Sequence, residues 1–554
     1  MQPKKLRRLG VAVVSLALVG SLAACAESQR DPAGTTTTGG GGTFVFAASS
    51  DPAMLDPALA SDGETFRVSR QLFEGLVGAA PGTTDVEPLL ATKWETAEDG
   101  KSTTFTLREG VKFHDGTDFN ADAVCTNFER WYNWTGLNQN ENITYYYGKI
   151  FRGYKTGKTG SIYDGCTAAS PTEVTIKLKA PFASFVQAMT LPAFSMQSPK
   201  ALEEFDADNT TGTADDTRFS AYATEHPTGT GPYKFEKWER DQAVTLKANP
   251  DYWGDKAKTE TVIIRTISDT RARVQELEAG SIDGFDLVGP GDVKALQDKG
   301  YQIQNRPAFN ILYLAFNQAS PALKKLKVRQ ALNHAIDKEA VLKSSLPPGS
   351  KAATQFMPDL VNGYNPSVPT YDYDVTKAKA LLKEAGEENL TLRFAYPTGV
   401  SRPYMPTPED TYQALKSQLE AAGIKVTPVA AKWRPDYQDL TSGPQGTTKR
   451  DVHLLGWTGD YNDPDNFLGV FFGAKSAEWG FDNPELFKAL DAGRALPTLE
   501  EQGPAYQKVA VQIAEFAPGV PIAHPAPSLA FAKDVQGYVA SPVQDEVWNN
   551  VTVG

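Results

Sequence analysis

An alternation of strand-like and helix-like segments in the second half of the chain constrains its fold more than any other feature. Amphipathic helical spacing is present at residues 327–340, 375–385 and 410–422, and short runs typical of strands lie at residues 310–316, 390–395, 425–429 and 451–455. Strands that alternate with helices of this length form βαβ units. The pattern therefore predicts an α/β lobe with a largely parallel sheet.

The first half carries further strand patterns, at residues 43–48, 103–108, 173–178 and 261–267. The full 554 residues are too many for one hydrophobic core at about 100–200 residues per domain, so two or three lobes are expected. The formal net charge is −12, and no long basic run follows the first residues. This balance argues against nucleic acid as a partner and against docking onto an anionic membrane surface.

The N-terminus has the pattern of a targeting segment. A start with four basic residues precedes the apolar or small residues 9–24, a run shorter than the about 20 residues of a spanning helix. Small residues directly before Cys25 resemble a bacterial lipoprotein box, which implies a signal peptide over residues 1–24 and a lipid on Cys25. An ordinary secretory signal is the alternative, and Arg7-Arg8 raises a twin-arginine export route.

Residues 25–42 are predicted to be a flexible tether, because they include four consecutive threonines and four consecutive glycines and almost nothing apolar. A lipid anchor and a tether would hold the protein at the outer face of the cell membrane. Oxidising surroundings there favour a disulfide between Cys125 and Cys166, with two buried free thiols as the alternative. No metal or cofactor is predicted, since C-x-x-C is absent and none of the five histidines has ligand-pair spacing.

The segment Gly456-Trp457-Thr458-Gly459-Asp460 follows the predicted strand at residues 451–455. Loops at the ends of strands concentrate ligand-binding groups, and Asp463-Pro464 signals a turn just beyond. We therefore expect Asp460 to be the anionic anchor of a binding cleft, with Trp457 and Tyr461 as a wall. An acidic, solvated turn is the alternative.

Five blocks in order resemble one family: LREGVKFHDG at 107–116, GTGPY at 229–233, ANPDYW at 248–253, VRQALNHAID at 328–337 and the segment at 456–467. Together they resemble the extracytoplasmic solute-binding proteins of ABC importers in the oligopeptide/dipeptide/nickel family (family 5). The second half is most similar to dipeptide-binding members. The resemblance implies a monomer that receives a small solute and passes it to permease and ATPase subunits.

The resemblance also implies an α/β fold of the periplasmic-binding-protein type, with two lobes that close about a hinge. The first lobe would span residues 43–305, with an inserted subdomain at about 86–199. The second lobe would span 306–517, and residues 518–554 would return to the first. Hinge segments are expected near 306–310 and 518–521.

For the site, the resemblance assigns Arg402 to a peptide carboxylate and Asp460 to the α-ammonium. Tyr404, Trp433 and Trp457 match walls, and the remaining matches are Gly456, Thr458, Gly63 and Thr65. Fixed partners suit a zwitterion, because burying an unpaired ion is costly and the arginine fork matches a carboxylate. Two alternatives remain: Arg402 is a solvated loop residue, and Trp433 is a packed core residue. The size of the pocket is also open, because the sequence differs from the family pattern in the acidic Asn462-Asp463 and in the longer, polar loop at 441–449.

Enzymatic motifs are missing: the chain has no G-x-S-x-G, no H-E-x-x-H and no P-loop. His114 fits a turn and His453 fits a buried core position, while the acids after 460 lack the glycine and glutamate of a calcium loop. We expect a binding protein rather than an enzyme. A secreted hydrolase, or the same fold with a nickel chelate or an oligosaccharide, remains a rival.

Overall fold

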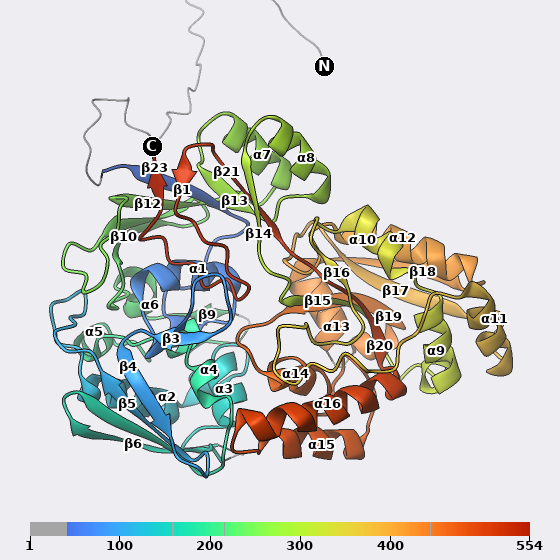
Figure 1. Ribbon diagram of the computed structural model, residues 1–554, viewed down its shortest axis with the longest axis horizontal. Coiled ribbons are helices and arrows are strands. Elements are labelled where there is room, and N and C mark those ends of the chain that lie inside the picture. The colour runs from blue at the N-terminus through green and yellow to red at the C-terminus, as the bar shows by residue number, and fades with distance from the viewer. Residues whose placement is uncertain (1–40, 158–159, 215, 444) are drawn as a thin grey trace, which may run out of the picture. The chain divides into compact units, whose positions relative to one another are not determined.

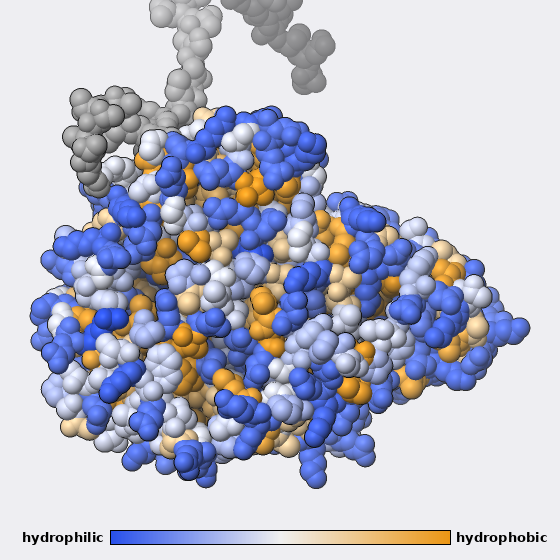
Figure 2. Space-filling view, viewed as in Figure 1, coloured by the Kyte–Doolittle hydropathy of each residue, from blue (hydrophilic) through white to orange (hydrophobic). Residues whose placement is uncertain are grey.

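The computed structural model describes residues 41–157, 160–214, 216–443 and 445–554 (Figure 1). The expected signal peptide, the lipidation site Cys25 and nearly all of the tether lie outside these residues. In the described ranges, every helix is either too short or too polar to cross a membrane. On the face shown in Figure 2, hydrophilic residues cover most of the surface and hydrophobic residues form separate patches.

The first lobe is built around a seven-stranded sheet. Its central strand, β1 (Thr43–Ala48), is almost wholly buried, so apolar side chains point to both faces, as in sheets covered on both sides. β1 pairs in parallel with β12 (Thr261–Thr266) and β13 (Gly284–Asp286). The outer strands are β10 (Tyr233–Glu239), β11 (Ala243–Ala248), β14 (Gln302–Asn305) and β21 (Ser528–Phe531).

Helices of this lobe are α1 (Gly63–Leu72), α5 (Pro199–Glu204), α6 (Ala221–Glu225), α7 (Thr270–Glu278) and α8 (Pro290–Asp298). α1 begins where the sequence offers a cap, because the Asp62 side chain accepts a hydrogen bond from the backbone N–H of Thr65 at 2.9 Å. Short two-stranded pairs join β2 (Val77–Ala79) to β3 (Val86–Pro88), β8 (Thr211–Gly212) to β9 (Thr217–Arg218), and β22 (Val535–Gln536) to β23 (Thr552–Val553).

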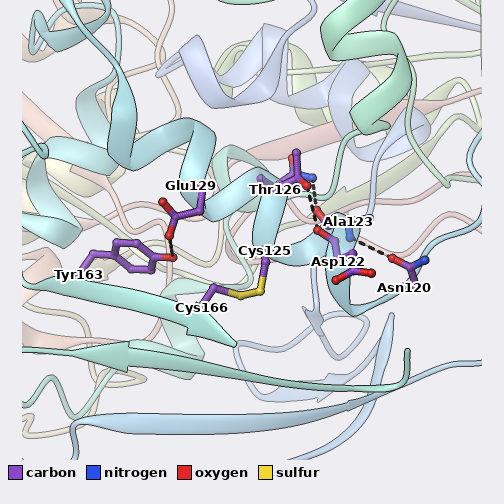
Figure 3. The surroundings of a disulfide bond; sticks show 9 residues. Asn120, Asp122, Ala123, Cys125, Thr126, Glu129, Tyr163 and Cys166 are labelled. Atoms are coloured by element: carbon purple, nitrogen blue, oxygen red, sulfur yellow. Dashed lines mark hydrogen bonds between the residues drawn. A yellow bond between two sulfur atoms is a disulfide. The ribbon is translucent and has the colours of Figure 1, made fainter. Parts of the chain in front are cut away.

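An inserted antiparallel sheet has its own core. Its order is β4 (Ala91–Thr96), β5 (Ser102–Leu107), β7 (Glu173–Leu178) and β6 (Tyr163–Ser170). α2 (Ala121–Asn133) packs against β6, and a disulfide joins Cys125 on the helix to Cys166 on the strand (Figure 3). α3 (Tyr145–Phe151) and α4 (Phe185–Ala188) complete this part.

The second lobe is built around a six-stranded sheet, in the order β16 (Lys351–Ala352), β20 (Gly519–His524), β15 (Asn310–Phe316), β19 (Val452–Thr458), β17 (Thr391–Thr398) and β18 (Lys425–Lys432). β17 runs parallel to β18 and β19, but β15 runs antiparallel to β19 and β20. The sheet is therefore mixed, and the expectation of a largely parallel sheet is wrong, because periodicity carries no information about strand direction.

Alternate residues of β15 enter two different cores. Leu312, Leu314 and Phe316 pack with α9 (Leu326–His334), α10 (Lys338–Ser345), α11 (Val375–Glu384) and α12 (Pro408–Ala421). Ile311, Tyr313 and Ala315 pack on the other face with α14 (Leu468–Phe472), α15 (Pro484–Arg494) and α16 (Leu499–Phe516), and α13 (Gln438–Ser442) follows β18. The single helix predicted at 327–340 is two helices, because Asp337 caps α10 by accepting from the N–H of Ala340.

The chain crosses twice between the two large sheets. The first crossing lies between β14 and β15, where the hinge segment at 306–310 is predicted. The second lies between β20 and β21 rather than at 518–521, because Val520 and Ile522 are buried in the second core and β20 still pairs with β15. The exact lobe boundaries and the hinge motion stay predictions.

Candidate functional site

The Asp460 carboxylate lies just past the end of β19, where the sequence predicts it. Its Oδ2 accepts a hydrogen bond from Nδ2 of Asn466 at 3.0 Å, while the Asp460 N–H donates to Oδ1 of Asn466 at 2.9 Å. Its Oδ1 accepts from the hydroxyl of Tyr146 at 2.7 Å. Tyr146 belongs to α3 of the inserted part, so the first lobe reaches this carboxylate directly.

Among the described residues, the hydrogen-bond partners of the Asp460 carboxylate are both neutral. In the described parts of the chain, no lysine, arginine or histidine nitrogen forms an ion pair with it. Burial raises the pKa of the Asp460 carboxyl to about 6, against the opposing hydrogen bonds from Asn466 and Tyr146 and the more distant charge of Arg70. A carboxylate in this setting gains from a cation brought by a ligand.

Tyr146, which donates to this carboxylate, belongs to a group of aromatic rings from both lobes. The Trp457 ring centroid lies 6.4 Å from that of Tyr145 in α3 and 6.4 Å from that of Phe471 in α14. The Tyr146 ring lies 5.1 Å from Tyr145 and 5.6 Å from Phe66 in α1. Burial raises the pKa of both tyrosines, so the phenols stay neutral and can donate hydrogen bonds.

Arg402 stacks on Trp433. The guanidinium carbon lies 4.2 Å from the Trp433 ring centroid, and the Trp433 ring lies 5.9 Å from Tyr437. The Nε of Arg402 is buried without a hydrogen-bond partner in the described chain. A stacked guanidinium with an unused donor is suited to an anionic group of a ligand.

Gly456 makes room for Tyr404. A Cβ at Gly456 would lie 2.3 Å from the backbone oxygen of Ile311 and 2.4 Å from the Tyr404 ring, so no side chain fits there. Tyr404 therefore packs against strand β19 and is mostly buried. Thr458 pairs with Asn310 at the end of the β15–β19 ladder, next to the Asp460 loop.

Thr65 and Gly63, the two residues of the first lobe that are expected to contact the ligand, both lie against other parts of the first lobe. The Thr65 hydroxyl accepts from the N–H of Ala53 at 3.0 Å and is fully buried, so the side chain positions the start of α1. A Cβ at Gly63 would lie 3.3 Å from Oε1 of Gln544. Direct ligand contact by Gly63 and Thr65 stays a prediction.

Sequence reasoning missed Tyr145, Tyr146 and Glu478. Oε1 of Glu478 accepts from the Tyr313 hydroxyl at 2.8 Å and lies 3.5 Å from Nε2 of His453. Burial lowers the pKa of His453 to about 4, so this imidazole is a neutral core group, as its place on a buried strand indicates. The consecutive tyrosines at 145–147 were a visible signal, but nothing local connects them to residue 460.

A second contact between the lobes lies beside the Asp460 loop. Arg494 in α15 donates to Oδ2 of Asp465 at 2.8 Å and to the backbone oxygens of Lys149 and Ile150, at 2.7 and 3.0 Å, in the last turn of α3. An outer ion pair joins Arg152 to Asp491 at 2.8 Å. In the described residues, no group of three His, Cys, Asp or Glu side chains is placed to hold a metal ion.

Comparison with known proteins finds binding proteins that match this chain over nearly its whole length. The chain is 30% identical over 533 residues to heme-binding protein A of Haemophilus influenzae, with 92% of each chain covered. It is 29% identical over 524 residues to the dipeptide-binding protein of Escherichia coli, covering 92% of this chain and 94% of that one.

Solved structures of binding proteins have the same fold as this chain. One is a periplasmic binding protein associated with an ABC transporter from Helicobacter pylori, in complex with the peptide STSA (26% identity, TM-score 0.75, 93% of this chain and 98% of that chain). Another is a dipeptide-binding protein of a Pseudoalteromonas species in complex with Met-Leu (27%, TM-score 0.77, 92% and 100%). Residues 85–479 match the model described as bacterial extracellular solute-binding proteins, family 5 middle, and the chain belongs to this family.

Proposed function

We propose that this protein binds short peptides, dipeptides above all, between its two lobes and delivers them to an ABC permease. The observation that carries the proposal is the Asp460 carboxylate, which accepts from two neutral donors, one of them Tyr146 of the other lobe, and has no ion pair in the part of the chain that the structure describes. The α-ammonium of a peptide would supply the positive charge that this carboxylate lacks.

Arg402 completes the proposal at the other end of the ligand. Its guanidinium is fixed by Trp433 and keeps an unused Nε–H, so it can pair with the terminal carboxylate of a peptide. Arg402 and Asp460 leave β17 and β19, two neighbouring strands of one sheet, just beyond their ends. Two relatives of the same fold are recorded with peptides bound, which supports the same class of ligand here.

The remaining parts of the proposal concern the whole protein. We infer that the protein is not an enzyme, that it is a monomer, and that a lipid on Cys25 holds it at the outer face of the cell membrane through the tether at residues 25–42. The permease and the ATPase would be its protein partners. Metabolic labelling with a fatty acid, compared between the wild type and Cys25→Ala, tests the anchor: label that persists in the variant would contradict it.

Calorimetry with matched ligands tests the binding mode. Ala-Ala, N-acetyl-Ala-Ala and Ala-Ala-amide would be titrated into the wild type and Asp460→Asn, with Asp491→Asn at the exposed ion pair as control. Acetylation is expected to weaken binding to the wild type by about 100-fold and to matter little in Asp460→Asn. Equal binding of free and acetylated peptide by the wild type would disprove the role of Asp460, and turnover of the peptide would establish a hydrolase.

A further inference from the structure

Glu478 is a second carboxylate on the sheet face that carries Trp457. In the antiparallel ladder of β15 and β19, Ile311 lies opposite Trp457 and Tyr313 lies opposite Leu455. These neighbouring pairs share one face and lie about 7 Å apart along the strand. The Tyr313 hydroxyl holds Oε1 of Glu478 at 2.8 Å, and the Phe471 ring contacts both Tyr313 (5.3 Å) and Trp457 (6.4 Å).

Glu478 forms no direct ion pair with a lysine or an arginine in the described residues. His453 is the nearest base, with Nε2 at 3.5 Å, but burial lowers its pKa to about 4 and leaves it neutral. Arg450 donates to the backbone oxygens of Ala477 and Glu478, at 3.0 and 3.1 Å; its charge acts on the Glu478 carboxylate from a distance, without an ion pair between them.

The second oxygen of this carboxylate is available. Within the described chain, Oε2 of Glu478 receives no hydrogen bond, and the side chain is 19% exposed. A carboxylate that is mostly withdrawn from water and has no direct ion pair is better stabilised when a cation binds it.

Tyr145 connects Glu478 to the ligand site. The Tyr145 ring lies 6.4 Å from Trp457 and comes from the first lobe, so it closes over the same face. Burial raises the pKa of the Tyr145 phenol, and the negative charges of Asp460, Glu141 and Glu478 raise it further. Asp460 and Glu478 therefore act on one phenol, next to the position proposed for the ligand's ammonium.

We propose that Glu478 binds the cationic side chain of a peptide's first residue and thereby selects lysine or arginine at that position. The inference rests on the proposed peptide-binding function, because Asp460 must hold the α-ammonium next to it. The flexible four-carbon stem of lysine can carry its ammonium past Trp457 while the terminal ammonium stays at Asp460. Leu455, Trp457 and Tyr145 would contact the stem, as apolar surfaces do for long basic side chains.

Calorimetry with side-chain isosteres tests the selection. Lys-Ala, norleucine-Ala, Ala-Lys and Ala-Ala would be titrated into the wild type, Glu478→Gln and Asp482→Asn, which removes a carboxylate from the exposed Lys475 pair in the same loop. The wild type and Asp482→Asn are expected to bind Lys-Ala at least about tenfold more tightly than norleucine-Ala. Glu478→Gln should lose this preference and bind Ala-Ala within about threefold of the wild type.

The outcomes separate the two proposals. The role of Glu478 is overturned if the wild type binds Ala-Ala but does not prefer Lys-Ala over norleucine-Ala. It is also overturned if Glu478→Gln keeps that preference. Either result leaves the peptide-binding function standing. A preference for Ala-Lys over Lys-Ala overturns the assignment to the first residue. Failure of the wild type to bind any of the four peptides removes both proposals. Tyr313→Phe, which keeps the charge, should retain the preference and serves as a second folded variant.

Discussion

The hydroxyl of Tyr146 lies 2.7 Å from Oδ1 of Asp460, although the two residues are 314 positions apart and belong to different lobes. The proposed ammonium-binding group is therefore part of the contact between the lobes. A ligand that binds Asp460 must share this carboxylate with Tyr146 or displace the phenol, so ligand binding and lobe contact are coupled at one side chain.

Peptide affinity should fall as the pH drops through about 6. The pKa of Asp460 is raised to about 6, so the carboxylate that holds an ammonium becomes protonated below that value. Below it, affinity should decrease by up to about tenfold per pH unit. Calorimetry at pH 5, 6 and 7.5 measures the effect, and Asp460→Asn, which retains the other buried acids Glu74 and Asp463, should lack this decrease.

The unliganded protein should show the opposite trend in its stability. Because the folded-state pKa of Asp460 is raised, its contribution to the free energy of unfolding is fully present below pH 3.8 and is lost as the pH rises through about 6. Asp460→Asn should therefore raise the free energy of unfolding at pH 7.5 by at most about 3 kcal/mol and change it little at pH 4. Urea unfolding at the two pH values measures this; an equal effect at both would contradict the ionisation argument.

Arg494→Lys should weaken the binding of every ligand by a similar factor. The variant keeps the charge beside Asp465 but loses the planar donors that reach the Lys149 and Ile150 oxygens. If the form in which the two lobes are in contact is destabilised by about 1.4 kcal/mol, the affinity for each ligand falls about tenfold, and the preference among ligands does not change. Small-angle scattering of the free variant should show a larger radius of gyration, whereas Arg152→Ala, at the exposed pair, should resemble the wild type. A loss confined to one peptide would argue for direct ligand contact instead.

Arg402→Met should reduce affinity for peptides with a free carboxyl terminus. Methionine can still pack on Trp433 but offers no charge and no N–H donors. The expected loss for Ala-Ala is about 30-fold or more, with Ala-Ala-amide little affected. A parallel loss for both ligands would mean that Arg402 acts through packing alone.

Replacement of both cysteines by alanine should destabilise the inserted part. The Cys125–Cys166 bond closes a loop with a sequence separation of 41, for which chain entropy gives about 4 kcal/mol. Thermal unfolding of Cys125→Ala/Cys166→Ala, compared with the oxidised wild type, measures the contribution, and the reduced wild type controls for the loss of the two thiols. Equal melting temperatures for the oxidised and reduced wild type would show that the bond adds nothing.

Local patterns predicted much of the second lobe and the position of Asp460. The strand before residue 456 and the turn at Asp463-Pro464 are both short-range signals, and the structure has Asp460 just past the end of β19. The ladder directions were not predictable in this way, since β20 reaches β15 from some two hundred residues away. The break in the predicted helix at 327–340 was visible in principle, because Asp337 is a standard capping residue.

The first-lobe side of the site could not be predicted from local sequence. Tyr146 acts through a contact across 314 positions, and Glu478 of the second lobe contacts Tyr313 across 165 positions; neither stands in a recognisable motif. The role of Tyr146 depends on how the surfaces of the two lobes meet, which no periodicity encodes. Thr65, in contrast, matched a family segment, but its hydroxyl and its N–H are used to build the start of α1.

The seven-residue helix α3 has both of its ends in contact with the second lobe. Tyr145 and Tyr146 at its beginning meet Trp457 and Asp460, and its final carbonyl groups receive Arg494. Since so short a helix moves as a rigid rod, a tilt that relaxes one end would shift the other. Binding of a ligand at Asp460 would therefore change the position of the outer surface near Arg152 and Asp491. A permease that contacts this surface would distinguish the ligand-bound protein from the free protein.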